Sequence, residues 1–296
     1  MRAIVTGGAG FIGSHLVDAL VARGDEVTVL DNFASGRHEH VNEFAKLRER
    51  DIQEPFHVEA DVVFHFAAQA DVRVSVERPG YDAAVNVLGT INVLEAARAA
   101  GARIVFASTG GAIYGECEAP AAEDAPRRPI APYGTSKLCG EEYLATYNRL
   151  YGARHVALRL GNVYGPRQDP HGEAGVVAIF LSRLRDGRRP RIFGDGEQVR
   201  DYVYVDDVVR AALTAAERPG GVYNVGTGIA TSVLELAAAC RSVSGSDVAH
   251  EHASSRPGEV RRSVLDVSAA AGDLGWRPEV GLEQGLRETW DWIAGQ

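Results

Sequence analysis

The sequence is short of cysteine, of lysine and of long apolar runs, and each shortage excludes a class of protein. Its three cysteines, Cys117, Cys139 and Cys240, are odd in number, far apart and without a CxxC pair, which argues against a disulfide framework or a zinc site. No apolar run approaches the ~18 residues of a membrane-spanning helix. The N-terminal residues pass directly into a short apolar run and then glycines, so we expect no signal peptide, no membrane contact and a cytoplasmic location.

Basic residues are fewer than acidic ones. The 296 residues contain 40 Asp and Glu against 31 Lys and Arg, a net charge of −9 that repels nucleic acid, so we expect no nucleic-acid partner. Only two of the basic residues, Lys46 and Lys137, are lysine. A lysine in this chain is rare enough to need a reason.

Short apolar runs alternate with helical patterns over the first half of the chain. This order predicts an α/β fold, with a doubly wound parallel sheet covered by helices on both faces. The expected strands are residues 3–6, 26–30, 62–66, 103–108 and 155–160, and the expected helices are 11–23, 81–100 and 133–151. The connection from residue 51 to 62 is too short for a crossover helix, so we expect a loop or a single turn there.

Looser sequence follows residue 161. We expect a first domain over residues 1–161 and a smaller α/β lobe over 162–296, with part of 200–225 packed back on the first domain. In the lobe we expect a hairpin of 191–193 with 199–205 around the Gly194-Asp195-Gly196 turn. Helices are expected near residues 176–186, 206–216, 232–242 and 282–293.

A glycine-rich turn, from Gly7 through Gly10 to Gly13, joins the first strand to the first helix. Such a turn lets backbone amides and a helix N-terminus approach a pyrophosphate. Asp31 ends the next strand, 18 residues beyond Gly13, where a carboxylate accepts hydrogen bonds from an adenosine ribose and repels a 2′-phosphate. The combination predicts NAD binding and favours NAD over NADP. Arg37 in the next loop is a weak opposite signal, and we interpret it as a solvated side chain.

Tyr133 and Lys137 open a helix at i, i+4 spacing, which places both side chains on one face. Ten tyrosines and two lysines give such a pair by chance with an expectation of roughly 0.07. A phenol with a pKa near 10 is a poor base at neutral pH unless a fixed cation and a nicotinamide ring favour its ionised form. Ser108 and Thr109 end a central strand at the ligand-binding edge, where a hydroxyl orients a substrate alcohol.

Together these residues resemble the extended short-chain dehydrogenase/reductase family, and within it the UDP-glucose 4-epimerases. The resemblance runs along essentially the whole chain, through Phe66-Ala67-Ala68, Asn86 in VNVLGT, the Tyr133-xxx-Lys137 pair, RLGNVYGP at 159–166, VRDYV at 199–203 and RPGE at 256–259. It implies a Rossmann-type fold, bound NAD, a UDP-sugar substrate and a homodimer built on the helices 81–100 and 133–151.

The resemblance also implies the roles of individual residues. Tyr133 is the catalytic base, Lys137 positions it, and Thr109, rather than Ser108, is its hydroxyl partner. The expected cofactor-binding residues are Gly7, Gly10, Phe11, Ile12, Asp31, Asn32, Ser35, Gly36, Asp51, Ile52, Phe66, Ala67, Ala68, Asn86, Ser108, Tyr133, Lys137, Leu160 and Val163. The expected substrate-binding residues are Val72, Thr109, Asn162, Gly175, Val176, Ile192, Phe193, Arg200, Tyr202, Arg256 and Glu259.

Two other functions remain open at this stage. A nucleotide-sugar 4,6-dehydratase shares the first oxidation, but Gly110-Gly111 stands where those enzymes place an acidic pair. A non-catalytic NAD-binding scaffold would hold the cofactor without turning over a sugar, and the intact Tyr133 and Lys137 argue against it. The pairs His38/His40 and His250/His252 have a spacing that a metal could use but no evident third ligand, so we expect no metal.

Overall fold

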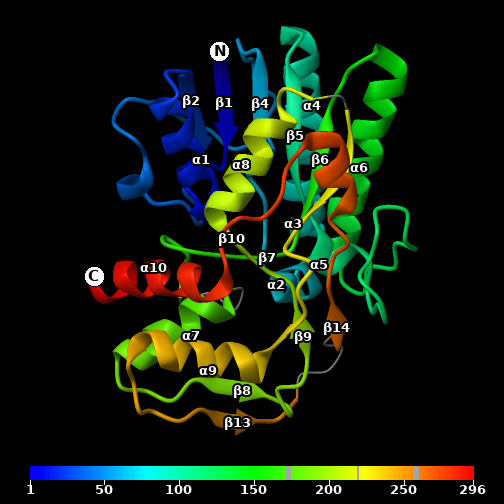
Figure 1. Ribbon diagram of the computed structural model, residues 1–296. Helices are drawn as coiled ribbons and strands as arrows, with labels where there is room; N and C mark the ends of the chain where they lie inside the picture. The colour runs from blue at the N-terminus through cyan, green and yellow to red at the C-terminus, as the bar shows by residue number, and fades with distance from the viewer. Residues whose placement is uncertain (171–174, 219, 256–259) are drawn as a thin grey trace.

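Seven strands form one sheet in which every neighbouring pair runs parallel. The computed structural model describes residues 1–170, 175–218, 220–255 and 260–296. In sheet order the strands are β11 (Gly221–Val225), β6 (Val156–Leu160), β5 (Arg103–Thr109), β4 (Val62–His65), β1 (Arg2–Thr6), β2 (Glu26–Asp31) and β3 (Lys46–Glu49). This arrangement confirms the expected doubly wound α/β fold (Figure 1).

Helices cover both faces of the sheet because its strands are apolar on both sides. In β1, Ala3 and Val5 pack toward α1 (Phe11–Ala22) and α8 (Val205–Ala215), whereas Ile4 packs toward the opposite helices. Those opposite helices are α4 (Gly89–Ala100) and α6 (Pro132–Tyr151). The core therefore has two layers with the sheet between them.

Two of the seven strands were not expected from the sequence. The four residues of β3 are all exposed and three of them are charged, so no apolar pattern marks this edge strand. The other strand, β11, lies far along the chain within 200–225, and it pairs with β6 while α8 packs on α1. The connection from residue 51 to 61 contains no helix or strand, as expected.

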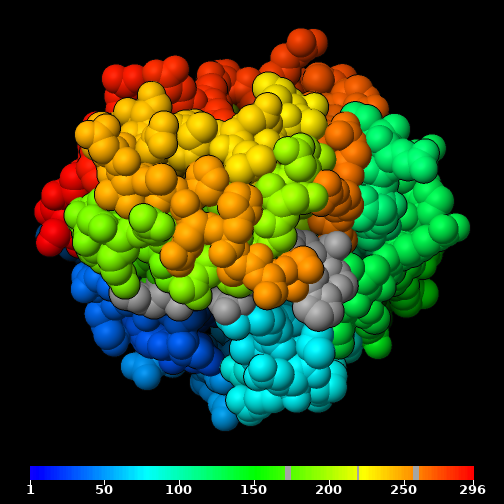
Figure 2. All heavy atoms as spheres, turned by 90° about the horizontal axis from the view of Figure 1, so that it is seen from below, coloured from blue at the N-terminus to red at the C-terminus, as the bar shows by residue number. Residues whose placement is uncertain are grey.

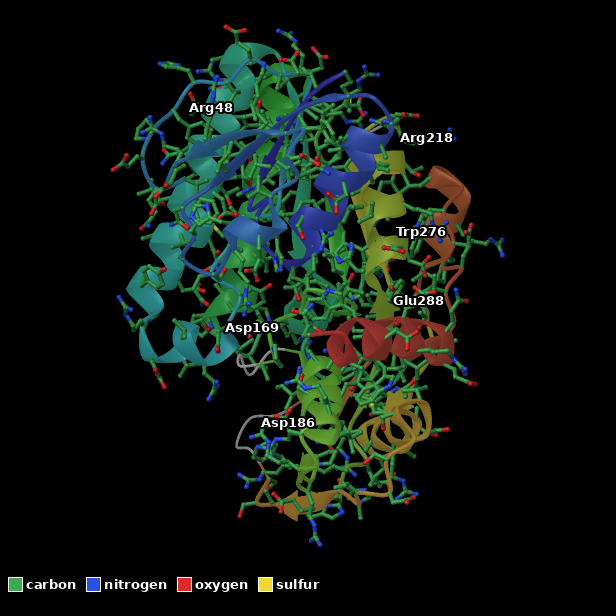
Figure 3. The ribbon with its side chains drawn as sticks, turned by 90° about the vertical axis from the view of Figure 1, so that its left-hand side faces the viewer. Arg48, Asp169, Asp186, Arg218, Trp276 and Glu288 are labelled. Carbon is green, nitrogen blue, oxygen red and sulfur yellow. The ribbon has the colours of Figure 1, made fainter. Side chains whose placement is uncertain are left out.

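The second part of the molecule consists of three helices packed against short paired strands. It lies below the main sheet in Figure 3, where Asp186 is labelled. These helices are α7 (Val176–Arg185), α9 (Val233–Ser244) and α10 (Leu282–Ala294). A capping box between Ser232 and Glu235 starts α9. In the view of Figure 2, atoms of α7, α9 and the neighbouring strands form the upper left of the face, and atoms from the N-terminal part of the chain lie below them.

The expected hairpin of residues 191–193 with 199–205 was wrong. Instead, β8 (Arg191–Phe193) pairs in parallel with β13 (Glu251–Ala253). The following segment divides in two: β9 (Val199–Arg200) pairs with β12 (Thr231–Ser232) and β14 (Arg262–Ser263), and β10 (Tyr202–Tyr204) pairs with β7 (Asn162–Tyr164). The Gly194 to Gly196 turn therefore carries the chain away from β8 without reversing it onto its neighbour.

The remaining elements are short. The expected helix over 81–100 consists of α3 (Pro79–Ala83), a π-helical segment η2 (Ala84–Leu88) and α4. The others are η1 (His38–His40), α2 (Val72–Glu77), α5 (Gly110–Ile113) and η3 (Ala270–Leu274). Within the described ranges, none of the helices combines the length and the apolar character needed to cross a membrane.

Candidate active site

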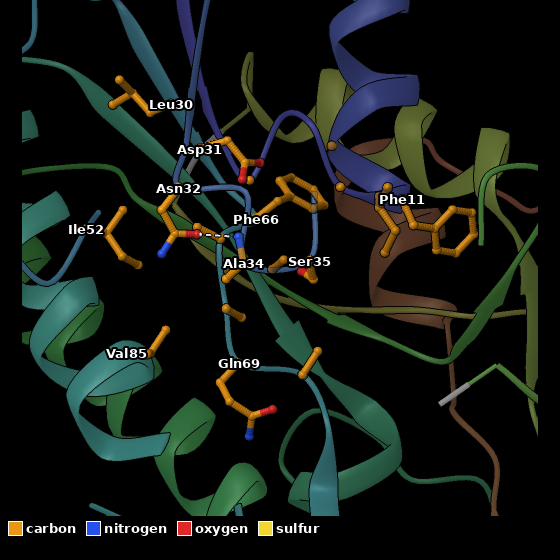
Figure 4. Close-up of a pocket in the computed structure, with 18 of the residues that line it drawn as sticks. Phe11, Leu30, Asp31, Asn32, Ala34, Ser35, Ile52, Phe66, Gln69 and Val85 are labelled. Carbon is orange, nitrogen blue, oxygen red and sulfur yellow. Dashed lines mark hydrogen bonds between the residues drawn. The ribbon is translucent and has the colours of Figure 1, made fainter. Parts of the chain in front are cut away.

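A crevice opens where the strand order reverses, at the carboxyl ends of β1 and β4. From β1 the chain builds β2 and β3 on one side, and it returns with β4 on the other side of β1. Because the loops after β1 and β4 diverge, a gap remains between them. The gap has a volume of about 300 Å³, and Figure 4 shows Asp31, Asn32, Ser35 and Gln69 among its lining residues.

The glycine turn after β1 has no room for side chains. Gly7 has a φ of +72°, and a Cβ atom there would lie 2.6 Å from the backbone nitrogen of Ala67. A Cβ on Gly13 would lie 2.1 Å from the carbonyl oxygen of Gly7. Gly10 precedes α1 and has no side chain that could cap the helix. The first amides of α1 therefore face the crevice without a side-chain partner.

Asp31 braces the same turn. Its carboxylate accepts hydrogen bonds from the backbone amides of Ala9 and Phe33, both at 2.9 Å, and only 7% of the residue is exposed. A carboxylate oxygen can accept more than one hydrogen bond, so Asp31 can still receive a ribose hydroxyl. Its negative charge at this position opposes a 2′-phosphate.

Most of the expected cofactor-binding residues line this crevice. They are Gly7, Gly10, Phe11, Ile12, Asp31, Asn32, Ser35, Asp51, Ile52, Phe66, Ala67, Ala68, Ser108, Tyr133, Lys137 and Leu160. Val163 lines an adjoining hollow of about 620 Å³. Gly36 packs against Asp31, where a Cβ would lie 2.8 Å from the Oδ1 atom, and is outside the lining of the crevice.

Asn86 is the clearest departure among the expected cofactor contacts. It is 2% exposed and is absent from the crevice wall. Its side chain instead holds Gln69, accepting from the Gln69 amide and donating to the Gln69 carbonyl, both at 2.9 Å. Asn86 therefore shapes the wall from behind.

Tyr133 lines the crevice and both adjoining hollows. Burial and the nearby charge of Asp82 raise the pKa of the Tyr133 phenol to about 12, while the neighbouring Thr109 hydroxyl acts in the opposite direction. Burial lowers the pKa of Lys137 to about 8, while the carboxylates of Asp82 and Glu141 oppose that change. The Lys137 ammonium donates to the Ala107 carbonyl at 2.8 Å.

Ser108 and Thr109 have different partners. Thr109 lies beside Tyr133 in the wall of the same hollow and lowers the pKa of its phenol, whereas the Ser108 hydroxyl donates to Glu141 at 2.5 Å. Glu141 forms a buried ion pair with Arg159 at 2.7 Å. This arrangement favours Thr109 as the hydroxyl beside the phenol.

A hollow of about 420 Å³ extends from Tyr133 toward the second part of the molecule. The expected substrate-binding residues in its wall are Val72, Thr109, Asn162, Gly175, Val176, Phe193, Arg200 and Tyr202. The side chain of Ile192 is fully buried in the core beside α7 and α9 and is absent from this wall. Arg256 and Glu259 lie outside the described residues.

Sequence reasoning missed two residues that the structure places at the site. Gln69 lines the crevice, and Asp82 lies behind it and interacts electrostatically with Tyr133 and Lys137. Neither belongs to a spacing pattern that marks chemistry, so the sequence offered no signal for them. Within the ranges that the structure describes, no three His, Cys, Asp or Glu side chains gather as a metal site would require.

A glycine turn at the switch point of a parallel sheet, with a Tyr and Lys pair beside it, defines the class of dinucleotide-dependent enzymes. The chain belongs to the NAD dependent epimerase/dehydratase family, whose model matches residues 3–226. It is 46% identical over 304 residues to the UDP-glucose 4-epimerase of Mycolicibacterium smegmatis, covering 98% of this chain and 97% of that protein.

Solved structures agree with this assignment. A UDP-glucose 4-epimerase of Thermotoga maritima, solved with UDP-glucose, superposes with a TM-score of 0.96 at 46% identity, covering 99% of this chain and 98% of that one. A UDP-glucose 4-epimerase of Thermus thermophilus, solved with NAD, gives a TM-score of 0.94 at 47% identity, covering 100% and 99%. The cofactor of the family is NAD, and the side-chain-free turn at Gly7 together with the carboxylate of Asp31 fits it.

Proposed function

We propose that this chain is an NAD-dependent epimerase that inverts C4 of a UDP-hexose through a transient 4-keto sugar. The observation that carries the proposal is the position of Tyr133, which lines both the cofactor crevice and the hollow toward the second part of the molecule. A proton-accepting phenol at that junction can act on a sugar hydroxyl beside a hydride acceptor. Relatives over the full length of the chain are UDP-glucose 4-epimerases, which supports the choice of reaction.

The residues around the glycine turn would hold the cofactor. The amides at the start of α1 would receive its pyrophosphate, and Asp31 would receive the adenosine ribose. When bound, NAD+ supplies a hydride acceptor at the sugar C4 and a positive ring charge that favours the ionised phenol. Because the epimerisation would be redox-neutral overall, turnover would consume no cofactor.

Tyr133 would take the proton of the 4-hydroxyl and give it back after inversion. Its pKa of about 12 within the protein alone means that the phenolate needs added positive charge. Thr109 would orient the same hydroxyl, since it lies beside Tyr133 in the wall of the same hollow. Lys137 would hold the ribose near the phenol as a compact cation.

The walls of the second hollow would bind the rest of the substrate. Arg200 suits the diphosphate because a guanidinium offers paired donors to phosphate oxygens, and Phe193 offers a flat apolar surface to the uracil. Asn162 and the amides near Gly175 would contact the sugar and diphosphate. The family resemblance adds Arg256 and Glu259 to this set. A hollow of about 420 Å³ leaves the hexose room to rotate between the two hydride transfers.

Incubating the purified protein with UDP-glucose, UDP-galactose, their N-acetylated forms and the UDP-uronic acids, without added NAD, tests the proposal. We expect interconversion of at least one C4-epimeric pair. A 4-keto-6-deoxy product would instead indicate a 4,6-dehydratase. Bound NAD with no sugar turnover would indicate the scaffold function.

A cytoplasmic homodimer is part of the same proposal. The three cysteines are free thiols, which suits a reducing compartment. Large apolar side chains are exposed on η2 and α6, among them Leu88, Leu150 and Tyr151. Light scattering should give about twice the chain mass of 31.7 kDa.

A further inference from the structure

Asp82 is a fully buried carboxylate directly behind the site. It lies in α3, its exposed fraction is 0%, and it accepts three hydrogen bonds. Gln69 Nε2 and Asn86 Nδ2 donate to Oδ1, each at 3.0 Å, and the Ser136 hydroxyl donates to Oδ2 at 2.5 Å. These donors come from the crevice wall, from η2 and from α6, so Asp82 joins the cofactor side of the site to the helix that carries Tyr133 and Lys137.

All three of these donors are neutral, which leaves the charge of Asp82 without a direct ion pair. Among the described residues, the hydrogen bonds to its carboxylate come from Gln69, Asn86 and Ser136, and none comes from a charged side chain. A buried carboxylate is costly unless a positive charge compensates it. Lys137, the residue that follows Ser136, is a buried ammonium that interacts electrostatically with Asp82.

We infer that Asp82 is the counter-ion of Lys137 and a positioning residue for the Tyr133 and Lys137 pair. The inference concerns the site of the proposed function and rests on that function only for its effect on turnover. Asp82 fixes α6 through Ser136 and fixes the crevice wall through Gln69. One carboxylate thus sets both the geometry and the charge of the pair.

The other groups around Lys137 do not supply this charge. Glu141, one turn further along α6, is already paired with Arg159. His65 of β4 is neutral at pH 7 because burial, and to a smaller extent the charge of Lys137, lowers its pKa to about 3. Tyr133 is neutral in the cofactor-free protein. Asp82 is therefore the negative group near Lys137 that no other cation neutralises among the described residues.

The two lysines of the chain make the charge relation directly measurable. Protein labelled with ¹³C-lysine gives two Cε signals, one from Lys137 and one from the exposed Lys46, which Lys46→Arg assigns. Asp82→Asn removes the charge and keeps the shape of the side chain, with an amide oxygen and an amide nitrogen in place of the two carboxylate oxygens. In cofactor-free protein we expect Lys137 to titrate about one pH unit or more lower in this variant, with Lys46 unchanged.

Two controls separate charge from structure. Asp61→Asn makes the same chemical change at an exposed residue paired with Arg2 and should leave the Lys137 midpoint unchanged. Ser136→Ala removes one hydrogen bond to Asp82 but keeps its charge, so its Lys137 midpoint should stay near that of the unchanged protein. An unaltered Lys137 midpoint in Asp82→Asn, or an equal fall in Ser136→Ala, would overturn the inference.

A further measurement needs no variant at Asp82, in case Asp82→Asn does not fold. If the two groups interact, the ¹³C chemical shift of the Asp82 carboxyl in the unchanged protein must change at the pH where Lys137 is half-deprotonated. A constant chemical shift through that pH contradicts the inference. With an active UDP-sugar, both limbs of the pH profile of kcat should move to lower pH in Asp82→Asn, because removal of one negative charge eases deprotonation of Tyr133 and of Lys137. If no UDP-sugar is turned over, the proposed function fails while the lysine titration still decides the role of Asp82.

Discussion

The Ser108 hydroxyl donates a 2.5 Å hydrogen bond to Glu141, whereas its neighbour Thr109 lies beside Tyr133 and lowers the pKa of that phenol. Successive side chains of a strand point to opposite sides, so adjacent hydroxyls at the end of β5 serve different partners. Ser108 belongs to a buried network that continues through Arg159 to Tyr114. Thr109 faces the hollow.

Thr109→Ala should reduce kcat by about 100-fold or more, because it removes a hydrogen-bonding group at the reacting hydroxyl, with little change in stability. Ser108→Ala should instead lower the free energy of unfolding by about 1.5–3 kcal/mol, since it deletes a buried hydrogen bond to a charged group. Steady-state kinetics and urea denaturation of both variants provide the test. The opposite pattern would move the catalytic role to Ser108.

Tyr133→Phe should lose nearly all turnover, because it removes the proton-accepting oxygen and leaves the ring in place. The crevice wall keeps its shape, so bound NAD should be retained and can be quantified after denaturing the protein. Tyr143→Phe, a change of the same kind on an exposed turn of α6, should keep normal activity. Substantial activity in Tyr133→Phe would refute the proposed mechanism.

Gly7→Ala should abolish NAD binding or folding, because the new Cβ would lie 2.6 Å from the Ala67 backbone as well as forcing a left-handed φ. Gly24→Ala is the matched control, since Gly24 also has a positive φ, +86°, but nothing within 4 Å of the new Cβ. The control should lose only about 1–2 kcal/mol of stability and keep its cofactor. Similar losses in both variants would show that backbone strain alone, and not close packing, makes Gly7 necessary.

His65 should make the fold sensitive to mild acid. It is buried between the hydroxyls of Thr6 and Thr90, at 2.8 and 3.0 Å, and burial lowers its pKa to about 3. The unfolded chain, with an ordinary histidine pKa near 6.5, takes up the proton first as the pH falls. Stability is therefore complete above about pH 6.5 and declines by up to about 1.4 kcal/mol per pH unit toward pH 3.

Urea denaturation at pH 7, 6 and 5 checks this dependence. Relative to the unchanged protein, His65→Gln should lose less stability at each step, because a neutral amide does not titrate. His252→Gln, at an exposed histidine, should follow the unchanged protein. Parallel pH curves for His65→Gln and the unchanged protein would show that His65 contributes nothing to the acid sensitivity.

The sequence predicted those parts of the fold whose residues carry a local signal. The glycine turn and Asp31 lie within residues 7–31, the Tyr133 and Lys137 pair spans one helical turn, and five strands carry apolar runs. The charged strand β3 carries no such run because it pairs at an exposed edge. The partner of β8 lies some 60 residues away in β13, so a nearby turn could not reveal it.

The supporting residues of the site could not be predicted for a similar reason. Asp82, Gln69 and Ser136 are distant in the sequence and ordinary in type, and they meet only once α3, the crevice wall and α6 are packed together. Asn86 was predicted to contact the cofactor, but its hydrogen bonds go to Gln69 and Asp82, behind the wall. A motif identifies a residue without saying which way its side chain points.

The pairing of β11 with β6 bears on how the enzyme could be divided. A fragment ending at residue 161 would lack β11 and α8, leaving the backbone of β6 as an open edge and uncovering the apolar side chains of α1. The nucleotide-binding part therefore cannot be excised as one continuous segment. The chain enters the second part of the molecule and then returns to add the last strand of the sheet. Any minimal version would have to be assembled from two separate stretches of the gene product.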